Sequence, residues 1–172
     1  KNTKVISFSD DPEIRSIIEK ADDYGNRGSK KYAAKGNPSL DIKNMLRNGY
    51  IKSMTESYVT QHIINNMNFE DYQTFIKISG RYCLTPNFDV TNFDVTSKYM
   101  LGSLHPSSQP ISPIDHEYKT YLWGFCTSII EDARKTILDT RNILSEHYNK
   151  DLIIDLEHAI YEATKGKLPM VQ

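Results

Sequence analysis

Residues 73–84, QTFIKISGRYCL, are the stretch on which the predicted fold depends. The stretch begins as a short strand because aromatic and β-branched side chains suit a buried, pleated surface: Phe75, Ile76 and Ile78. The strand ends at Gly80, since glycine adopts backbone angles that other residues avoid. Arg81 and Tyr82 follow directly. An open α/β sheet presents polar groups to a ligand at the carboxyl ends of its strands, so the stretch predicts a ligand-facing turn.

Arg81 is the residue of this turn with the clearest chemistry. Its planar guanidinium donates two parallel hydrogen bonds, which suits a phosphate group. The same residues also fit a strand that simply ends in a turn, with Arg81 exposed to water. Spacing alone leaves both interpretations open.

Three stretches resemble one protein family. Residues 75–84 are similar to the K-[IL]-[ST]-G-R-Y segment of small bacterial and viral glycosyltransferase-like proteins, which are associated with capsule, lipopolysaccharide or glycan synthesis. Residues 121–125 (YLWGF) and 155–161 (DLEHAIY) resemble that family's closing pattern of an aromatic strand and a helix carrying Glu-His. The likeness covers roughly residues 60 to 165 and implies a GT-A-like enzyme of polysaccharide biosynthesis that uses a nucleotide-sugar donor.

The composition fits one globular domain over residues 1–172. The formal net charge is −1 and the pI is about 6.6, so no general basic field argues for a nucleic-acid partner. No apolar run reaches the ~18 residues that a membrane span needs, and no signal peptide is visible. Cys83 and Cys126 stand in apolar contexts and indicate buried thiols in a reducing compartment, which predicts a cytoplasmic location, or the host cytoplasm for a viral protein.

The order of elements predicts an α/β fold with a mostly parallel central sheet flanked by helices, GT-A or Rossmann-like. A strand at residues 4–8 precedes a helix from about residue 9 to residue 21. Helical spacing continues at about 41–49, where Gly49 marks an end or a close contact, and from Tyr50 or Ser53 to about Asn66. The strand at 4–8 resembles the family's second strand rather than its first. Either it serves as the first, or the chain is a fragment without the nucleotide-binding strand.

The second half of the chain predicts two more strands and two helices. Residues 97–101 suit a short strand, and residues 102–115, with three prolines and four serines, suit a lid or acceptor loop. Residues 118–126 read as one buried strand with three aromatic side chains on one face: Tyr121, Trp123 and Phe125. Helices are expected at about 127–147 and at 151–164.

The predicted site residues follow from these patterns and from the resemblance. Catalytic roles fall to Glu157, which the resemblance implies is the acidic group of the site, to its neighbour His158 and to Asp94. Substrate-binding roles fall to polar or aromatic residues of the central stretch and of the aromatic strand: Lys77, Ser79, Gly80, Arg81, Tyr82 and Trp123. Trp123 suits stacking on a sugar ring, but an aromatic core strand would look the same.

The predicted cofactor is a hard cation, Mn²⁺ or Mg²⁺, with Asp89 as a ligand. Asp89 and Asp94 belong to two NFDV words, and aspartate also commonly caps turns. Most nucleotide-sugar transferases of this type carry Asp-x-Asp after a central strand, where this chain has Ser79-Gly80-Arg81. That departure leaves a metal-independent reaction open, with Arg81 stabilising the diphosphate.

Two alternatives remain beside transfer from a nucleotide sugar to a glycan or lipid-linked acceptor. One is a non-catalytic α/β domain, viral or accessory, that binds a protein partner. The other is a HEPN-like RNase, because Arg141-Asn142 and His147 nearly match the R-N-x-x-x-H spacing. HEPN domains are all-helical, and the strands expected at 75–78 and 121–125 argue against that assignment.

Overall fold

The computed structural model describes residues 12–13, 15–16, 19, 38–79, 85–89, 99–100, 104–109, 112–152 and 154–166, with backbone alone for 38–46 and 99–100. Its elements run α2 (Pro38–Asn66), β1 (Thr74–Ile78), β2 (Tyr99–Met100), β3 (Leu104–Pro106), β4 (His116–Tyr118), β5 (Leu122–Cys126), η3 (Thr127–Ile129), α3 (Ile130–Asn149) and α4 (Leu156–Thr164). The strand predicted at 4–8 lies outside the described residues.

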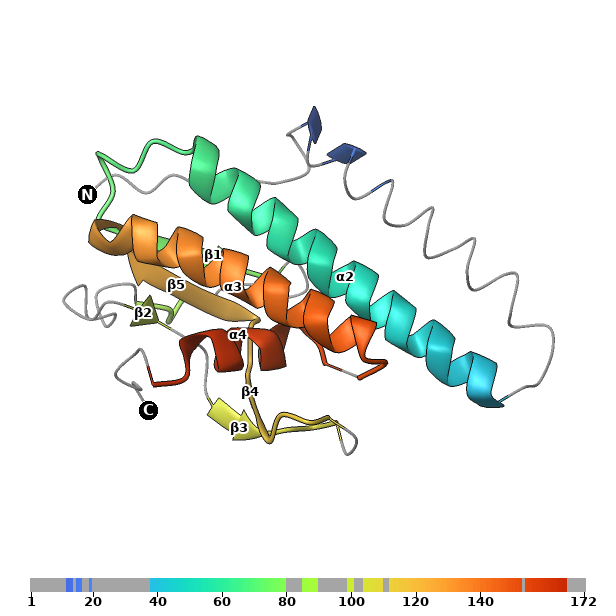
Figure 1. Ribbon diagram of the computed structural model, residues 1–172. Helices are drawn as coiled ribbons and strands as arrows, with labels where there is room; N and C mark the ends of the chain where they lie inside the picture. The colour runs from blue at the N-terminus through green and yellow to red at the C-terminus, as the bar shows by residue number, and fades with distance from the viewer. Residues whose placement is uncertain are drawn as a thin grey trace.

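Two long helices and one short helix form a layer over the strands (Figure 1). α2 and α3 lie side by side, and α4 packs against the other flank of α3. α2 is continuous through Gly49, so this glycine does not end a helix. A Cβ there would meet nothing within 4 Å, so the alternative of a close packing contact is wrong as well. A helix tolerates an isolated glycine at a cost of roughly 1 kcal/mol, which the packing of so long a helix offsets.

The strands form antiparallel pairs, which corrects the prediction of a mostly parallel GT-A or Rossmann-like sheet. One sheet has the order β1-β5-β2 and the other pairs β3 with β4. Parallel neighbours need a crossover connection, usually a helix. Here α2 precedes all five strands and α3 follows them, so the described elements form an α+β arrangement.

The expected strand at 118–126 is two strands joined by a turn at Thr120-Tyr121. The turn separates the three aromatic residues that were expected on one face. Trp123 and Phe125 are 5% and 0% exposed, whereas Tyr121 is 41% exposed. The break matters for function because it places Thr120 opposite α4.

Two apolar clusters hold the layers together. The first joins α2, α3 and the β1-β5-β2 sheet: Val59, Ile63, Ile64, Phe75, Trp123, Phe125, Ile129, Ala133 and Ile137. The second joins α4 to the far half of α3 and to β4: Ile114, Tyr118, Leu144, Ile154, Leu156, Ala159 and Ile160. α4 therefore has one face in the core and its first turn beside β4.

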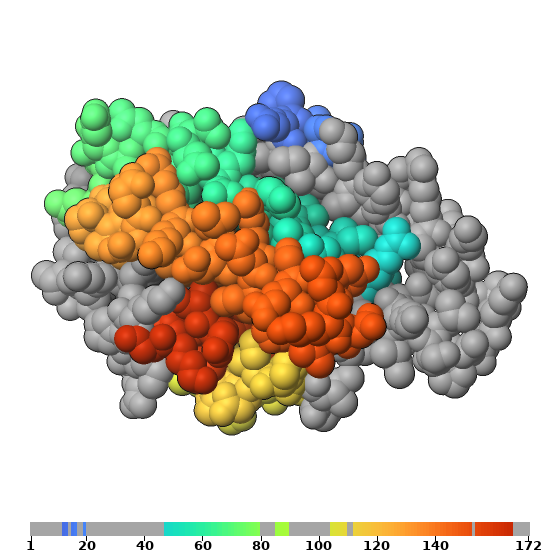
Figure 2. Space-filling model, viewed as in Figure 1, coloured from blue at the N-terminus to red at the C-terminus, as the bar shows by residue number. Residues whose placement is uncertain are grey.

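The helices make up one continuous face, and the β3–β4 segment adjoins α4 at its edge (Figure 2). Among the residues that the structure describes, no helix has both the length and the apolar character needed to cross a membrane.

Gly124 of β5 lies so close to the backbone of β1 that the fold leaves no room for a side chain there. A Cβ at Gly124 would lie 2.1 Å from the carbonyl oxygen of Phe75 on β1. We expect Gly124→Ala to destabilise the protein by about 3 kcal/mol or more, because β1 and β5 must separate at this pair. Urea unfolding followed by circular dichroism measures the change.

Gly49→Ala is the matched control, since a Cβ at Gly49 meets nothing within 4 Å. It should stabilise the protein by roughly 0.5–1 kcal/mol, because alanine suits a helix interior better than glycine. Equal effects of the two substitutions would contradict the β1–β5 register.

Candidate functional site

The site begins at the N-terminus of α4, which Asp155 caps. Its Oδ1 accepts a hydrogen bond from the backbone N–H of His158 at 3.2 Å, so one otherwise unpaired donor of the first turn is satisfied. The N–H of Leu156 donates to Ser53 Oγ of α2 at 3.1 Å. These bonds fix where α4 starts and which way His158 points.

His158 is completely buried and has partners at both ring nitrogens. Nδ1 lies 2.6 Å from Asp155 Oδ1, and Nε2 lies 2.7 Å from Ser107 Oγ. Nε2 also lies 3.5 Å from Glu117 Oε2. An ionised carboxylate only accepts hydrogen bonds, so Nδ1 carries a hydrogen that it donates to Asp155. We call Ser107, Glu117, Asp155 and His158 the His158 cluster.

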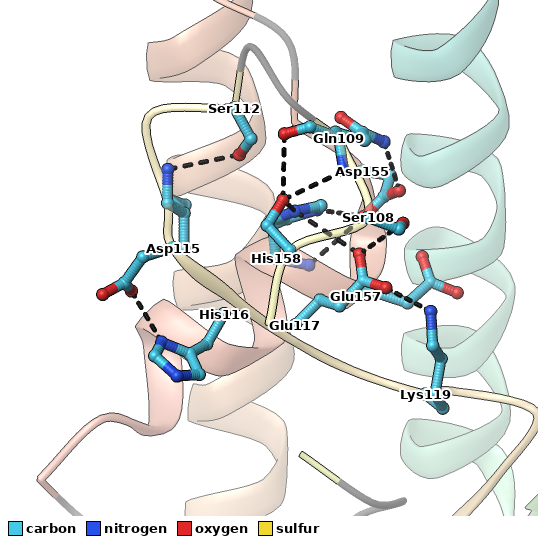
Figure 3. Close-up of polar contacts among 12 residues, drawn as sticks. Ser108, Gln109, Ser112, Asp115, His116, Glu117, Lys119, Asp155, Glu157 and His158 are labelled. Carbon is cyan, nitrogen blue, oxygen red and sulfur yellow. Dashed lines mark hydrogen bonds and ion pairs between the residues drawn. The ribbon is translucent and has the colours of Figure 1, made fainter. Parts of the chain in front are cut away.

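The β3–β4 segment supplies the other side of this cluster (Figure 3). Glu117 lies on β4, is 1% exposed, and forms an ion pair with Lys119. Ser108 Oγ donates to Glu117 Oε2 at 3.0 Å, and Gln109 Nε2 donates to Asp155 Oδ2 at 2.6 Å. The cluster therefore ties the loop after β3 to α4.

Hydrogen bonds decide the charge of two carboxyl groups. Burial by itself would raise the pKa of Asp155, but the hydrogen bonds and the charge of His158 outweigh it and hold that pKa below its usual range. Burial likewise opposes ionisation of Glu117, yet Lys119 and Ser108 lower its pKa. Lys119 shows the complementary effect, because its hydrogen bond to Glu117 raises its own pKa.

A second group of polar contacts meets at Thr120, in the turn between β4 and β5. Thr120 Oγ1 donates to Glu157 Oε1 at 2.6 Å, and Lys77 Nζ donates to the carbonyl oxygen of Thr120 at 3.5 Å. Lys77 also forms an ion pair with Glu56 of α2. The backbone N–H of Ser79 donates to the carbonyl oxygen of Tyr121 at 2.9 Å. We call these contacts the Thr120 junction.

Glu157 differs from its acidic neighbours because nothing in the described residues forms an ion pair with it. Burial is the main cause that raises its pKa, and the nearby charge of Asp155 raises it further. The hydrogen bond from Thr120 acts in the opposite direction and does not cancel the rise. Glu157 therefore takes up a proton more readily than an exposed glutamate does.

Several predicted site residues come together. Glu157, Lys77 and Ser79 meet around the Thr120 junction, and His158 adjoins it on α4. Trp123 instead lies in the core, with its ring 6.2 Å from that of Phe75.

Other predicted residues lie elsewhere. Asp89 is exposed just after a turn closed by the Phe88 N–H, and it does not belong to the group of possible metal ligands among the described residues. Four more fall outside the described part of the chain, so their predicted roles stay predictions: Gly80, Arg81, Tyr82 and Asp94.

The residues of the HEPN-like motif lie on α3, and Arg141 and His147 contact different partners. Arg141 lies 4.2 Å over the ring of Tyr58 and hydrogen-bonds Gln61. His147 Nδ1 donates to the carbonyl oxygen of Ile143 at 2.9 Å.

Sequence reasoning missed Ser107, Glu117 and Asp155. Asp155 had a usable signal, since an aspartate directly before an apolar helical run is a typical N-cap. Glu117 also had one, because a glutamate beside Tyr118 near an apolar strand predicts a buried charge that needs partners. Ser107 lies in the stretch predicted as a lid or acceptor loop, but four serines there made the choice impossible from sequence.

The negative charge of Glu117 limits the reactions that the His158 cluster can catalyse. Ser107, His158 and Asp155 are connected like a nucleophile, a base and an orienting acid. Acyl transfer by such a chain builds negative charge beside the nucleophile. Glu117 is buried 3.5 Å from the ring nitrogen and would oppose that charge. The arrangement therefore suits a proton or a cation rather than an oxyanion.

No protein-family model, curated protein or solved structure matches this chain. Any assignment of chemistry to the site therefore depends on the resemblance of the three short stretches and on the geometry described above.

The opposite pKa shifts of Glu157 and Asp155 predict opposite pH dependence. A raised pKa in the folded state means that stability falls as pH rises from the usual glutamate range through the raised value. Glu157→Gln removes this loss, so it should raise the free energy of unfolding at neutral pH and have little effect in acid. Urea unfolding between about pH 4 and pH 8 measures the difference.

Asp155→Asn should do the reverse. A lowered pKa contributes stability above the usual aspartate range, and this contribution is lost as pH falls through the lowered value. The substitution should therefore destabilise the protein at neutral pH, by a margin that shrinks in acid. Two variants with the same pH profile would contradict the described environments.

Proposed function

We propose that this chain is a glycosyltransferase that moves a sugar from a nucleotide-sugar donor to a hydroxyl group of a glycan or a lipid-linked acceptor. One observation carries the proposal. Lys77, the first residue of the K-I-S-G-R-Y stretch, and Glu157 of the Glu-His helix lie far apart in the sequence, yet both contact Thr120.

Glu157 is the proposed general base. It accepts the proton of the acceptor hydroxyl, the hydroxyl oxygen attacks the anomeric carbon, and the bond from that carbon to the diphosphate breaks with its electrons on the diphosphate. A base works best when its pKa lies near the working pH. The raised pKa of Glu157 supports this role.

The diphosphate needs positive charge as it leaves. Arg81 is the proposed source, since its guanidinium fits phosphate oxygens and it follows Lys77 of β1 and Ser79 in the sequence. Lys77 is 7% exposed and is already paired with Glu56, so we assign it to holding the Thr120 turn in place. Ser79 and Gly80 would let the backbone approach the donor.

The proposed activity does not depend on a parallel sheet, because function resides in a site rather than in a fold. Under this proposal the enzyme works in the cytoplasm, or in the host cytoplasm for a viral protein, where nucleotide sugars are its donors. The free thiol of Cys126 suits such a reducing compartment.

Donor binding is tested by a thermal-shift screen of the purified chain against UDP-, GDP-, CMP- and dTDP-sugars, with and without Mn²⁺. Ligand at about 100 times its Kd should add about 2.7 kcal/mol to the stability of the folded state. A shift with one nucleotide supports the proposal and identifies the base. A flat screen on folded protein contradicts it and favours the non-catalytic partner-binding domain.

Catalysis is tested with two variants and a control. Glu157→Gln should lower turnover by about 10²–10⁴-fold while donor binding stays, because only the base is lost. Arg81→Ala should weaken donor binding itself. Glu162→Gln changes an exposed glutamate of the same helix and should change neither. Full turnover in Glu157→Gln would exclude it as the base.

A further inference from the structure

We infer that the His158 cluster binds a divalent transition-metal ion through His158 Nε2, Glu117 Oε2 and Ser107 Oγ. This site differs from the cation site that the sequence predicted at Asp89. It goes beyond the proposed transferase activity, because metal binding can be measured without any sugar.

The first support is the orientation of the imidazole ring. Histidines that bind metals almost always donate their second ring N–H to a carboxylate or a carbonyl, which fixes the ring and leaves the other nitrogen free to coordinate. His158 has this arrangement, with Nδ1 2.6 Å from Asp155 Oδ1. Asp155 is itself held by the amide of Gln109 at 2.6 Å. The ring is therefore preset with Nε2 toward β4.

The second support is the spacing of the atoms around Nε2. Ligands about 2.1 Å from an ion lie about 3.0 Å apart as octahedral neighbours and about 3.4 Å apart in a tetrahedron. Glu117 Oε2 lies 3.5 Å from Nε2, and Ser107 Oγ lies 2.7 Å from it. Each oxygen is therefore close to a ligand-to-ligand distance from Nε2, and an ion bound to Nε2 would reach each of them after small shifts of the side chains.

The third support is the balance of charge. Lys119 pairs with Glu117, and His158 pairs with Asp155, so one lysine and one imidazole face these two carboxylates among the described residues. A divalent cation bound to Nε2 and to Glu117 Oε2 adds positive charge beside the buried carboxylate of Glu117 and so lowers the cost of burying it. The same charge opposes an anionic ligand at this place.

The donor atoms also indicate which ions fit. One imidazole with carboxylate and hydroxyl oxygens suits Mn²⁺ or Zn²⁺ better than Mg²⁺, which prefers oxygen ligands alone. Ser107 is only partly buried and Ser108 is exposed, so the ion would enter from the loop after β3. Three protein ligands leave further coordination positions for water or for a ligand oxygen.

The test begins with the unaltered full chain, stripped of metal with EDTA. Calorimetric titration with MnCl₂ and with ZnCl₂ should each show one site, and MgCl₂ should bind at least about tenfold more weakly. In an NMR titration, paramagnetic Mn²⁺ should broaden the backbone signals of residues 107–109, 117 and 155–158 first. Absence of binding, or broadening that begins elsewhere, would overturn the inference.

Variants then distinguish the residues that bind the ion from residues that only lie near it. Glu117→Gln removes a ligand and should weaken Mn²⁺ binding by more than about 100-fold, whereas Asp155→Asn removes only the orienting contact and should weaken it by about 10–100-fold. Glu157→Gln is the matched control: it alters a nearby carboxyl group that is not a ligand and should change affinity by less than about tenfold.

Circular dichroism shows whether each variant is folded. If a variant does not fold, the NMR titration of the unaltered chain decides where the ion binds. A larger loss in Glu157→Gln than in Glu117→Gln would place the ion elsewhere and overturn the assignment. Failure of the donor screen would leave the metal result unchanged, so the two proposals can fail separately.

Discussion

The carboxylate of Asp155 is the contact on which the site depends. It accepts from the backbone N–H and the imidazole of His158 and from the amide of Gln109. One side chain thus starts α4, orients the buried histidine and holds the loop after β3. Charge-assisted hydrogen bonds are the strong ones, and here they offset the cost of burying an acid near others.

Helix positions were largely predictable, and strand pairing was not. The apolar stripe of α3 is nearly continuous in the sequence, so a helix over 127–147 was predicted and confirmed. The β1–β5 pairing joins residues far apart in the chain, and no local pattern reveals its direction. The order of elements, with the strands grouped between α2 and α3, favours antiparallel pairing, whereas the strand and helix expected near the N-terminus favour a parallel sheet.

The candidate site was likewise predictable only where a local sequence pattern was enough. Glu157 and His158 were chosen from a short string on one helix, and local spacing suffices to find such a string. Ser107 and Glu117 became visible only when β3 and β4 were placed against α4, because tertiary contacts alone bring them within 3.5 Å of the ring nitrogen. Trp123 illustrates the opposite problem, since a core aromatic and a sugar-stacking aromatic have the same local pattern.

The β1–β5 pairing has a consequence for how such a protein can diversify. Ile78 pairs with Leu122, and the segment between them adds β2 to the same sheet and forms β3 and β4, so its two ends meet at one closed base. Doubling the length of a flexible loop costs only about 0.6 kcal/mol, so an insertion in a connection between these strands costs the folded core little. For the proposed transferase, acceptor preference would therefore change through insertions between these strands while the helices and the β1–β5 pair stay as they are.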